Sequence, residues 1–282
     1  MPRFKYYWLL NPIRSDIENS NVCGYHICNR STIVEGQSEL GVEGKIFFEM
    51  LQRTFLLYDH CLWIFRTDEF ECQGDANAFS KIFRTVLESF YYFKVSLPGF
   101  VIVDSSSNEV LAKQPPQVEE YKSSKLDTIS EADLARTLLL CEKLFSMDSE
   151  EADKFLSILD YLRDIRNAPV FVGELALWSF IEHYWSQKQD GNTDINQSLK
   201  VLLEFVYENK DDRKEINLLL RSVGTDLGKQ YDEHMIRNIL AHGKHITLKE
   251  NWTEDNWVKF YEVHDRLLTT VVLGIEKQIS AV

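Results

Sequence analysis

The chain has 282 residues, 44% of them hydrophobic and 12% aromatic, a composition that supports one or two folded domains with substantial cores. Its 6 prolines and 12 glycines leave little room for long disordered tracts. The formal net charge of −13 excludes a general attraction for phosphate backbones, so any contact with nucleic acid requires a local basic patch.

No run of residues is long and apolar enough to predict a membrane span, and the N-terminal residues do not resemble a secretory signal. The 5 cysteines are an odd number and are scattered along the chain. This usage favours reduced thiols over a disulfide framework. We therefore expect a cytoplasmic protein that makes no contact with membranes.

The first 115 residues predict an α+β domain. Runs rich in aromatic and β-branched residues, bounded by turn formers, predict strands. The run 76–93 has apolar residues three and four positions apart, which predicts a helix, while 42–59 fits either type of element. The predicted strands are 4–10, 22–34, 60–65 and 99–113.

Two groups of residues in the chain raise the question of a metal. Cys23, His26 and Cys28 lie close together, but their surroundings alternate like a strand and no second Cys/His pair completes a tetrahedral zinc site. Glu43-x-Lys45 and Glu208-x-Lys210 fit the end of a metal-dependent nuclease motif. We favour strand residues for the first group and solvated charges for the second, and we expect no metal and no cofactor.

A linker is predicted at 116–129, because Pro115 and Pro116 prevent regular pairing and the polar run after them has no apolar period. The residues from 130 to 282 predict an all-α bundle, which begins at the capping pair Ser130 and Asp133. Four tryptophans at helical spacings are predicted to be core: Trp178, Trp185, Trp252 and Trp257. The predicted helices are 130–145, 149–166, 170–187, 195–208, 214–224, 231–242 and 253–279.

The run "MIRNILAHGKH" at 235–245 contains the strongest candidates for chemistry. Arg237 and His242 are five positions apart, which on a straight helix is a turn of about 140° and a rise of roughly 7.5 Å. The two side chains can therefore converge only if the helix ends or bends between them, or if one comes from a second copy. Gly243 favours a helix end, where a charged imidazolium is also stabilised.

These residue types suit cleavage of a phosphodiester without metal. A histidine can deprotonate a ribose 2′-OH or protonate the leaving oxygen, and an arginine can hold the phosphate. Asn238 can orient the phosphate or the histidine. Lys229, Lys244 and His245 can supply a local basic patch for RNA, although lysines near a helix C-terminus also complement its dipole.

The segment "RNILAHG" resembles the Arg-Asn-x-x-Ala-His-Gly signature of the HEPN domain superfamily, in particular its ApeA-like group. The order of elements is similar as well: an early amphipathic helix with a glutamate, here Glu182, precedes the motif, and one long helix follows it. The resemblance covers roughly residues 130 to 282. It implies an HEPN-like bundle in which Arg237 and His242 are catalytic and Asn238 is the polar residue beside the arginine.

The resemblance further implies a metal-independent endoribonuclease that acts in anti-phage defence, abortive infection or as a toxin. HEPN domains pair their motifs, so a homodimer is expected, together with an RNA substrate and a possible antitoxin or sensor partner. Lys244 stands where some HEPN toxins carry a tyrosine that is modified, which argues against that form of regulation. The first 115 residues would sense a trigger or recognise the substrate. The alternative is a non-catalytic HEPN-fold module for dimerisation or interaction.

Overall fold

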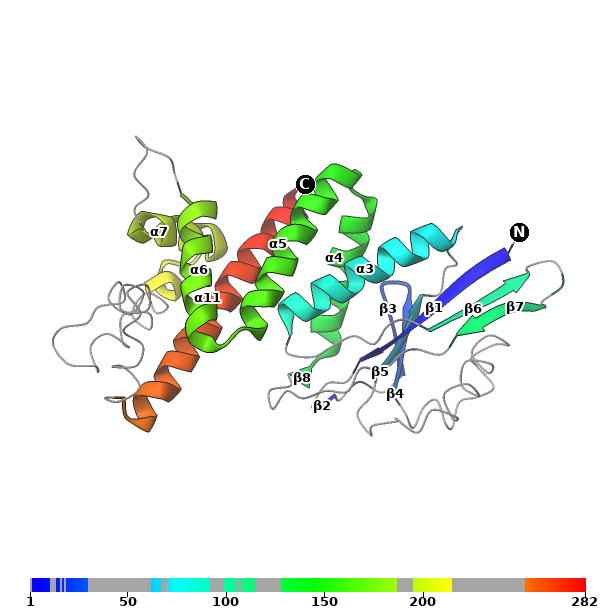
Figure 1. The fold of residues 1–282 in the computed structure, drawn as a ribbon, viewed down its shortest axis with the longest axis horizontal. Helices are drawn as coiled ribbons and strands as arrows, with labels where there is room; N and C mark the ends of the chain where they lie inside the picture. Colours follow the sequence, from blue (N-terminus) through cyan, green and yellow to red (C-terminus); the bar gives the residue numbers. More distant parts are fainter. Residues whose placement is uncertain are drawn as a thin grey trace. The chain divides into compact units, whose positions relative to one another are not determined.

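The structure is a computed structural model that describes residues 2–10, 14–15, 17, 19–29, 62–66, 70, 72–91, 99–104, 107, 109–114, 128–186, 195–214 and 252–282. The chain divides into two compact units, Met1–Leu156 and Ser157–Val282. The first unit combines an antiparallel sheet with helices, and the described part of the second is helical (Figure 1). An α+β region followed by a helical region is therefore confirmed.

A six-stranded antiparallel sheet organises the first unit. Its strand order is β3-β4-β5-β1-β6-β7, so the first strand of the chain lies inside the sheet with β5 on one side and β6 on the other. The predicted strands 4–10, 60–65 and 99–113 correspond to β1, β5 and the β6–β7 hairpin. The bounds are β1 Pro2–Leu10, β3 Asn19–Val22, β4 Tyr25–Asn29, β5 Leu62–Arg66, β6 Gly99–Asp104 and β7 Val110–Gln114.

A tight turn begins the region that was predicted as one strand over 22–34. Cys23 and Gly24 both have positive φ, 54° and 82°, and they connect β3 to β4 as an antiparallel hairpin. Positive φ at both central residues is typical of two-residue hairpins. The prediction is thus confirmed for Tyr25–Asn29, and the turn accounts for its late start.

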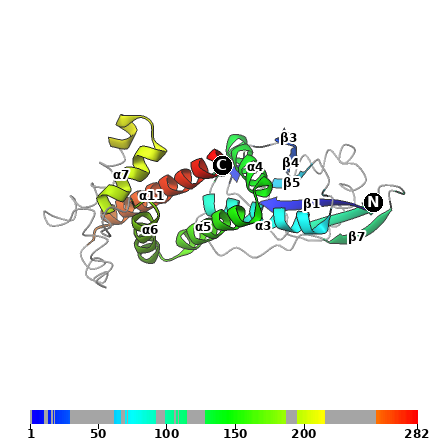
Figure 2. The same ribbon diagram turned by 90° about the horizontal axis from the view of Figure 1, so that it is seen from above.

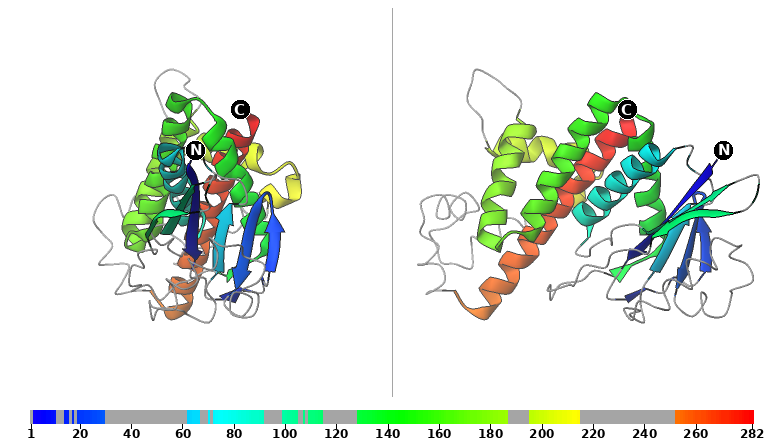
Figure 3. Two further views of the ribbon diagram at one scale, coloured as in Figure 1. Left: turned by 90° about the vertical axis from the view of Figure 1, so that its right-hand side faces the viewer. Right: turned by 45° about the vertical axis from the view of Figure 1, so that its right-hand side comes forward.

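The core of the first unit lies between one face of the sheet and α3 (Gln73–Phe90). Trp8, Ile64 and Ile27 are paired across three neighbouring strands, and all three are fully buried. Phe83 of α3 packs on Trp8, with ring centroids 5.0 Å apart. The helix lies alongside the sheet in each view of Figure 3. Pairs of this kind bury large apolar areas, which is the dominant favourable contribution to folding.

Helix α4 (Glu131–Ser146) packs on α3 and belongs to the first unit. The predicted capping box is confirmed, because the Asp133 amide donates to Ser130 Oγ at 3.2 Å and the Ser130 amide donates to Asp133 Oδ2 at 3.3 Å. Just before it, β8 (Thr128–Ile129) pairs in parallel with β2 (Arg14–Ser15). The last residues of the predicted linker 116–129 therefore form a short strand.

Helix α5 (Ser149–Asn167) spans the division between the units, which falls between Leu156 and Ser157. This division is later in the chain than the linker on which the predicted domains 1–115 and 130–282 rest. The difference arises because α4 packs on α3 and so adds to the first unit.

Three further helices complete the described part of the second unit. They are α6 (Val170–Tyr184), α7 (Ile195–Val206) and α11 (Glu254–Ala281). Both α6 and α7 pack against α11 and against each other (Figure 2). The helices predicted for 214–224 and 231–242 lie outside the described residues, apart from residue 214, and so does the run 42–59.

The start of α11 agrees with its prediction. Thr253 Oγ1 accepts from the Asn256 amide at 3.3 Å, the Asn256 side chain accepts from the Thr253 amide at 3.0 Å, and Glu254 and Asp255 lie in the first turn. Acidic groups at this end of a helix are stabilised by its dipole.

Candidate functional site

The residues predicted to carry the chemistry lie outside the part of the chain that the structure describes. This holds for the predicted catalytic residues Arg237, Asn238 and His242, and for the predicted RNA-binding residues Lys229, Lys244 and His245. Their positions relative to one another stay a prediction. The elements on either side are described: α7 ends at Val206, and α11 begins at Glu254.

A buried polar network connects α11 to α6 in the second unit. Glu174 on α6 and His264 on α11 lie 90 residues apart in sequence, yet Glu174 Oε2 and His264 Nδ1 are 2.6 Å apart. The other carboxylate oxygen, Oε1, accepts a hydrogen bond from the Trp178 indole N–H at 2.8 Å. Glu174 is 2% and His264 4% exposed, so water does not satisfy this carboxylate.

The apolar stripes of two helices bring the pair together. On α6, Glu174 shares the buried stripe with Leu177, Trp178 and Ile181. On α11, His264 lies among buried apolar residues at helical spacing: Phe260, Val263, Leu267, Leu268 and Val271. Packing the two stripes together therefore removes both polar groups from water. A buried carboxylate is stable only when it is paired and hydrogen-bonded, and the pair provides that.

Gly173 permits the close approach of three chain segments at this point. A Cβ atom here would lie 2.8 Å from the backbone oxygen of Ile165 on α5 and 3.3 Å from Cε1 of His264. The first distance is shorter than real Cβ contacts allow, and backbone cannot move aside as a flexible side chain can. Glycine is therefore needed to place Glu174 opposite the histidine.

The hydrogen bond faces one particular nitrogen of the histidine toward the carboxylate. An ionised carboxylate only accepts hydrogen bonds, so His264 must donate through Nδ1.

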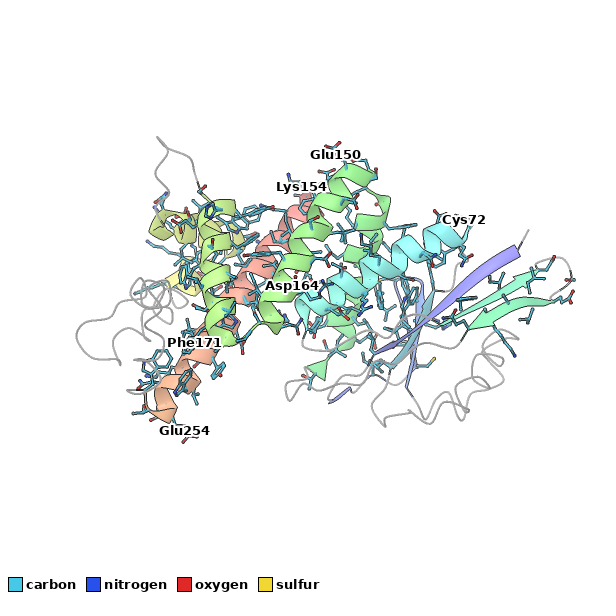
Figure 4. All side chains as sticks on the ribbon, viewed as in Figure 1. Cys72, Glu150, Lys154, Asp164, Phe171 and Glu254 are labelled. Carbon is cyan, nitrogen blue, oxygen red and sulfur yellow. The ribbon has the colours of Figure 1, made fainter. Side chains whose placement is uncertain are left out.

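An aromatic cluster lies beside this network at the start of α11. Phe171 of α6 is 6.1 Å from Trp252, 5.4 Å from Trp257 and 5.5 Å from Phe260, measured between ring centroids. Phe171 and Glu254 are labelled in Figure 4 and mark the region where these rings gather. The prediction that the tryptophans are core is confirmed for Trp178, Trp185 and Trp252, which are buried, while Trp257 is half-buried.

Glu182, the glutamate that the HEPN resemblance singles out, lies on α6 two turns beyond Glu174 and is partly exposed. Sequence reasoning missed Glu174 and His264, although a signal for them exists. Each is a single ionisable residue inside an otherwise apolar helical stripe. A polar residue in such a position must find a buried partner, but the sequence does not indicate which helix provides it.

The first unit contains a second polar cluster. The Tyr25 hydroxyl on β4 donates to Glu142 on α4, and Arg66 Nε on β5 lies 3.4 Å from the same carboxylate oxygen. The Arg66 guanidinium also lies over the Phe70 ring, 5.0 Å from its centroid. Burial raises the pKa of Tyr25 far above its ordinary value, and the hydrogen bond to Glu142 and the charge of that carboxylate add to this effect. Burial, followed by the charge of Glu142, raises the pKa of the Cys141 thiol.

Within the described ranges, no three or more His, Cys, Asp and Glu side chains are grouped so that they could hold a metal ion. Cys23 lies exposed in the β3–β4 turn, and Cys28 is buried on β4. Glu208 and Lys210 follow α7 and are exposed, not on a strand, so the interpretation of this pair as solvated charges is confirmed. Glu43 and Lys45 lie outside the described residues.

Comparison of the chain with protein-family models, with curated proteins and with solved structures finds no match. Among the described helices, none combines the length and the apolar character needed to cross a bilayer.

Proposed function

We propose that the chain is a metal-independent endoribonuclease of the HEPN type. The observation that carries the proposal is the Arg-Asn-x-x-Ala-His-Gly sequence at 237–243, followed by a single long terminal helix. The helical character of the described second unit supports it, because α6, α7 and α11, which flank this sequence in the chain, pack on one another.

In the proposed reaction His242 accepts the proton of a ribose 2′-OH. The 2′ oxygen attacks the adjacent phosphorus, the bond to the 5′ oxygen breaks, and that oxygen takes a proton from an imidazolium. Arg237 holds the phosphate and stabilises its developing charge, and Asn238 orients the group. No metal and no cofactor takes part. Lys229, Lys244 and His245 supply the positive charge that the chain as a whole lacks.

The resemblance extends the proposal to the assembly and its role. Two copies form a homodimer in which two Arg/His motifs face each other, and the RNase acts as an effector of anti-phage defence, abortive infection or a toxin system. The residues 1–115 sense a trigger, recognise the substrate or restrain the nuclease, alone or with an antitoxin or sensor partner.

The test incubates the purified full chain with total RNA in EDTA, beside His242→Ala and Arg237→Ala. Loss of general acid–base catalysis lowers the rate by about 10²–10⁴-fold. His183→Ala is the matched control, because His183 is an exposed histidine on α6 and its removal leaves the motif intact. The mass in solution, measured on the same samples, tests the dimer.

Each outcome supports a different function. Cleavage that persists in EDTA and disappears in His242→Ala, but not in His183→Ala, supports the proposal. Cleavage that EDTA abolishes would favour a metal-dependent nuclease. A chain that does not cleave RNA but remains a stable dimer would favour the non-catalytic interaction module.

A further inference from the structure

Two kinds of contact hold the start of α11 against α6. The first is the aromatic cluster of Phe171 with Trp252, Trp257 and Phe260, which is apolar. The second is the buried pair Glu174–His264, about three turns into α11, with oxygen and nitrogen 2.6 Å apart. The residues that α11 contributes to both contacts lie within about three turns of Trp252, the first described residue after the segment that carries Arg237 and His242.

The two contacts constrain the helices differently. Apolar burial is non-directional, so aromatic rings remain packed when a helix rotates slightly or shifts along its axis. A hydrogen bond weakens steeply when its angle falls below about 120°. One residue of slip turns a helix by about 100°, which would carry His264 away from the carboxylate and leave Glu174 buried without it. Of the two contacts at the start of α11, the polar pair is therefore the one that selects a rotation; near the other end of the same helices the Tyr184 hydroxyl donates to Gln278 Oε1 at 2.6 Å.

We propose that Glu174 and His264 are positioning residues that fix the rotation and axial position of α11 against α6, and with them the point at Trp252 where the motif-bearing segment joins the helix. The inference rests on the proposed function where it concerns cleavage. The pair contacts neither substrate nor reacting atoms. It acts through the position of Trp252 on the segment that carries the proposed catalytic residues His242 and Arg237, and misplacement of catalytic groups by about 1 Å can cost roughly 100-fold in rate.

Trp178 and Gly173 lie next to the Glu174–His264 pair. The Trp178 indole N–H holds the second carboxylate oxygen, so the Glu174 side chain cannot rotate freely. Gly173 leaves room beside the imidazole, because a Cβ atom there would lie 3.3 Å from Cε1 of His264. The carboxylate is thus held by a further group, as a directional contact requires.

The test replaces the polar pair by an apolar one, Glu174→Met with His264→Leu. Exchange of a buried pair for apolar side chains of similar volume is often neutral for stability, and the thioether remains a weak acceptor for the Trp178 indole. The control, Leu177→Met with Leu267→Met, alters two fully buried residues of the same helices without touching the pair. Amide hydrogen exchange over 252–263, kcat and KM for RNA cleavage, and Tm are measured for all three proteins.

We expect amide hydrogen exchange over 252–263 to be roughly tenfold faster in the polar-to-apolar variant than in the control, at similar Tm. We also expect kcat of the polar-to-apolar variant to fall about 10- to 100-fold with little change in KM. Wild-type exchange and wild-type kcat in the polar-to-apolar variant would overturn it. If wild-type protein does not cleave RNA, the proposed function is lost, and the exchange measurement alone decides the positioning role.

If the Glu174→Met/His264→Leu variant does not fold, two single variants at His264 test the positioning role instead. His264→Asn places an amide N–H close to the position of Nδ1, whereas His264→Gln places it one bond further out. The positioning role expects near wild-type exchange and kcat for the asparagine variant, and faster exchange with lower kcat for the glutamine variant. Equal behaviour of the two variants would overturn the proposal.

Discussion

The two units each contain a carboxylate that accepts from an aromatic side chain and lies beside a basic group, but the two carboxylates differ in burial. The Glu142 side chain is 30% exposed beside Tyr25 and Arg66, whereas the Glu174 side chain is 3% exposed between Trp178 and His264. Water reaches the Glu142 carboxylate and can replace a lost partner. Water does not reach the Glu174 carboxylate, so desolvation sets the cost of breaking its pair with His264.

The largest expected effect is that of His264→Leu, which leaves the Glu174 carboxylate buried with the Trp178 indole as its remaining partner. Breaking a buried pair on one side costs about 3–5 kcal/mol in the free energy of unfolding. Urea unfolding of the full chain measures it. If the loss were below about 1 kcal/mol, the magnitude typical of exposed pairs, the contrast between the two clusters would disappear.

Gly173→Ala tests the close packing around the buried pair. Alanine is favoured over glycine in a helix by about 1 kcal/mol, but its Cβ would lie 2.8 Å from the Ile165 carbonyl oxygen. Because that oxygen belongs to the backbone, the clash should outweigh the helix preference and cost about 1–3 kcal/mol net. A stabilised alanine variant in thermal unfolding would contradict this packing.

Alkaline pH should act on the first unit through its buried groups. Folding raises the pKa of Cys141 above its ordinary 9.0 and that of Tyr25 above 10.0, in both cases chiefly through burial. Above these values the unfolded chain loses protons that the folded chain retains, so the stabilisation present below pH 9 is lost as the pH rises. The slope is about 1.4 kcal/mol per pH unit for each group.

Urea unfolding between about pH 8 and pH 11 measures this loss. Tyr25→Phe removes one of the groups whose pKa folding raises, and the slope above pH 10.0 should decrease accordingly. An unchanged slope in this variant would mean that the Tyr25 hydroxyl does not stay protonated in the folded state.

The smallest effect is expected for Glu142→Gln, which keeps an acceptor for the Tyr25 hydroxyl and removes the ion pair with Arg66. Pairs that water can reach contribute about 0.2–1 kcal/mol, and the loss should fall as salt is added. Unfolding at low and high salt measures both. A cost as large as that of His264→Leu would show that burial does not separate the two clusters.

The sequence predicts features that depend on neighbours along the chain. The capping pair Ser130 and Asp133 is predicted because a capping box is a local hydrogen-bond pattern, and the structure contains it. The apolar periods of 4–10 and 170–187 located β1 and α6 for the same reason, with ends correct to within a few residues.

The sequence does not predict features that depend on residues far away in the chain. The pairing of β1 with both β5 and β6 follows from tertiary packing, as does the meeting of Glu174 with His264 across 90 residues. Periodicity indicates that a residue is buried but does not identify what it contacts. The motif residues Arg237 and His242 are a prediction from sequence, and the RNase and exchange experiments are their test.

The strand order of the first unit has a consequence for synthesis of the chain. The first strand is interior to the sheet, and its Pro2 pairs with Asp104 of β6. At about 5–20 residues per second, a ribosome needs on the order of 5–20 s to make the intervening chain. During that time the edge of β1 that pairs with β6 has no partner, and such edges bind other chains or chaperones. Yield in cells should therefore respond to translation speed over these residues more than over those that encode the second unit.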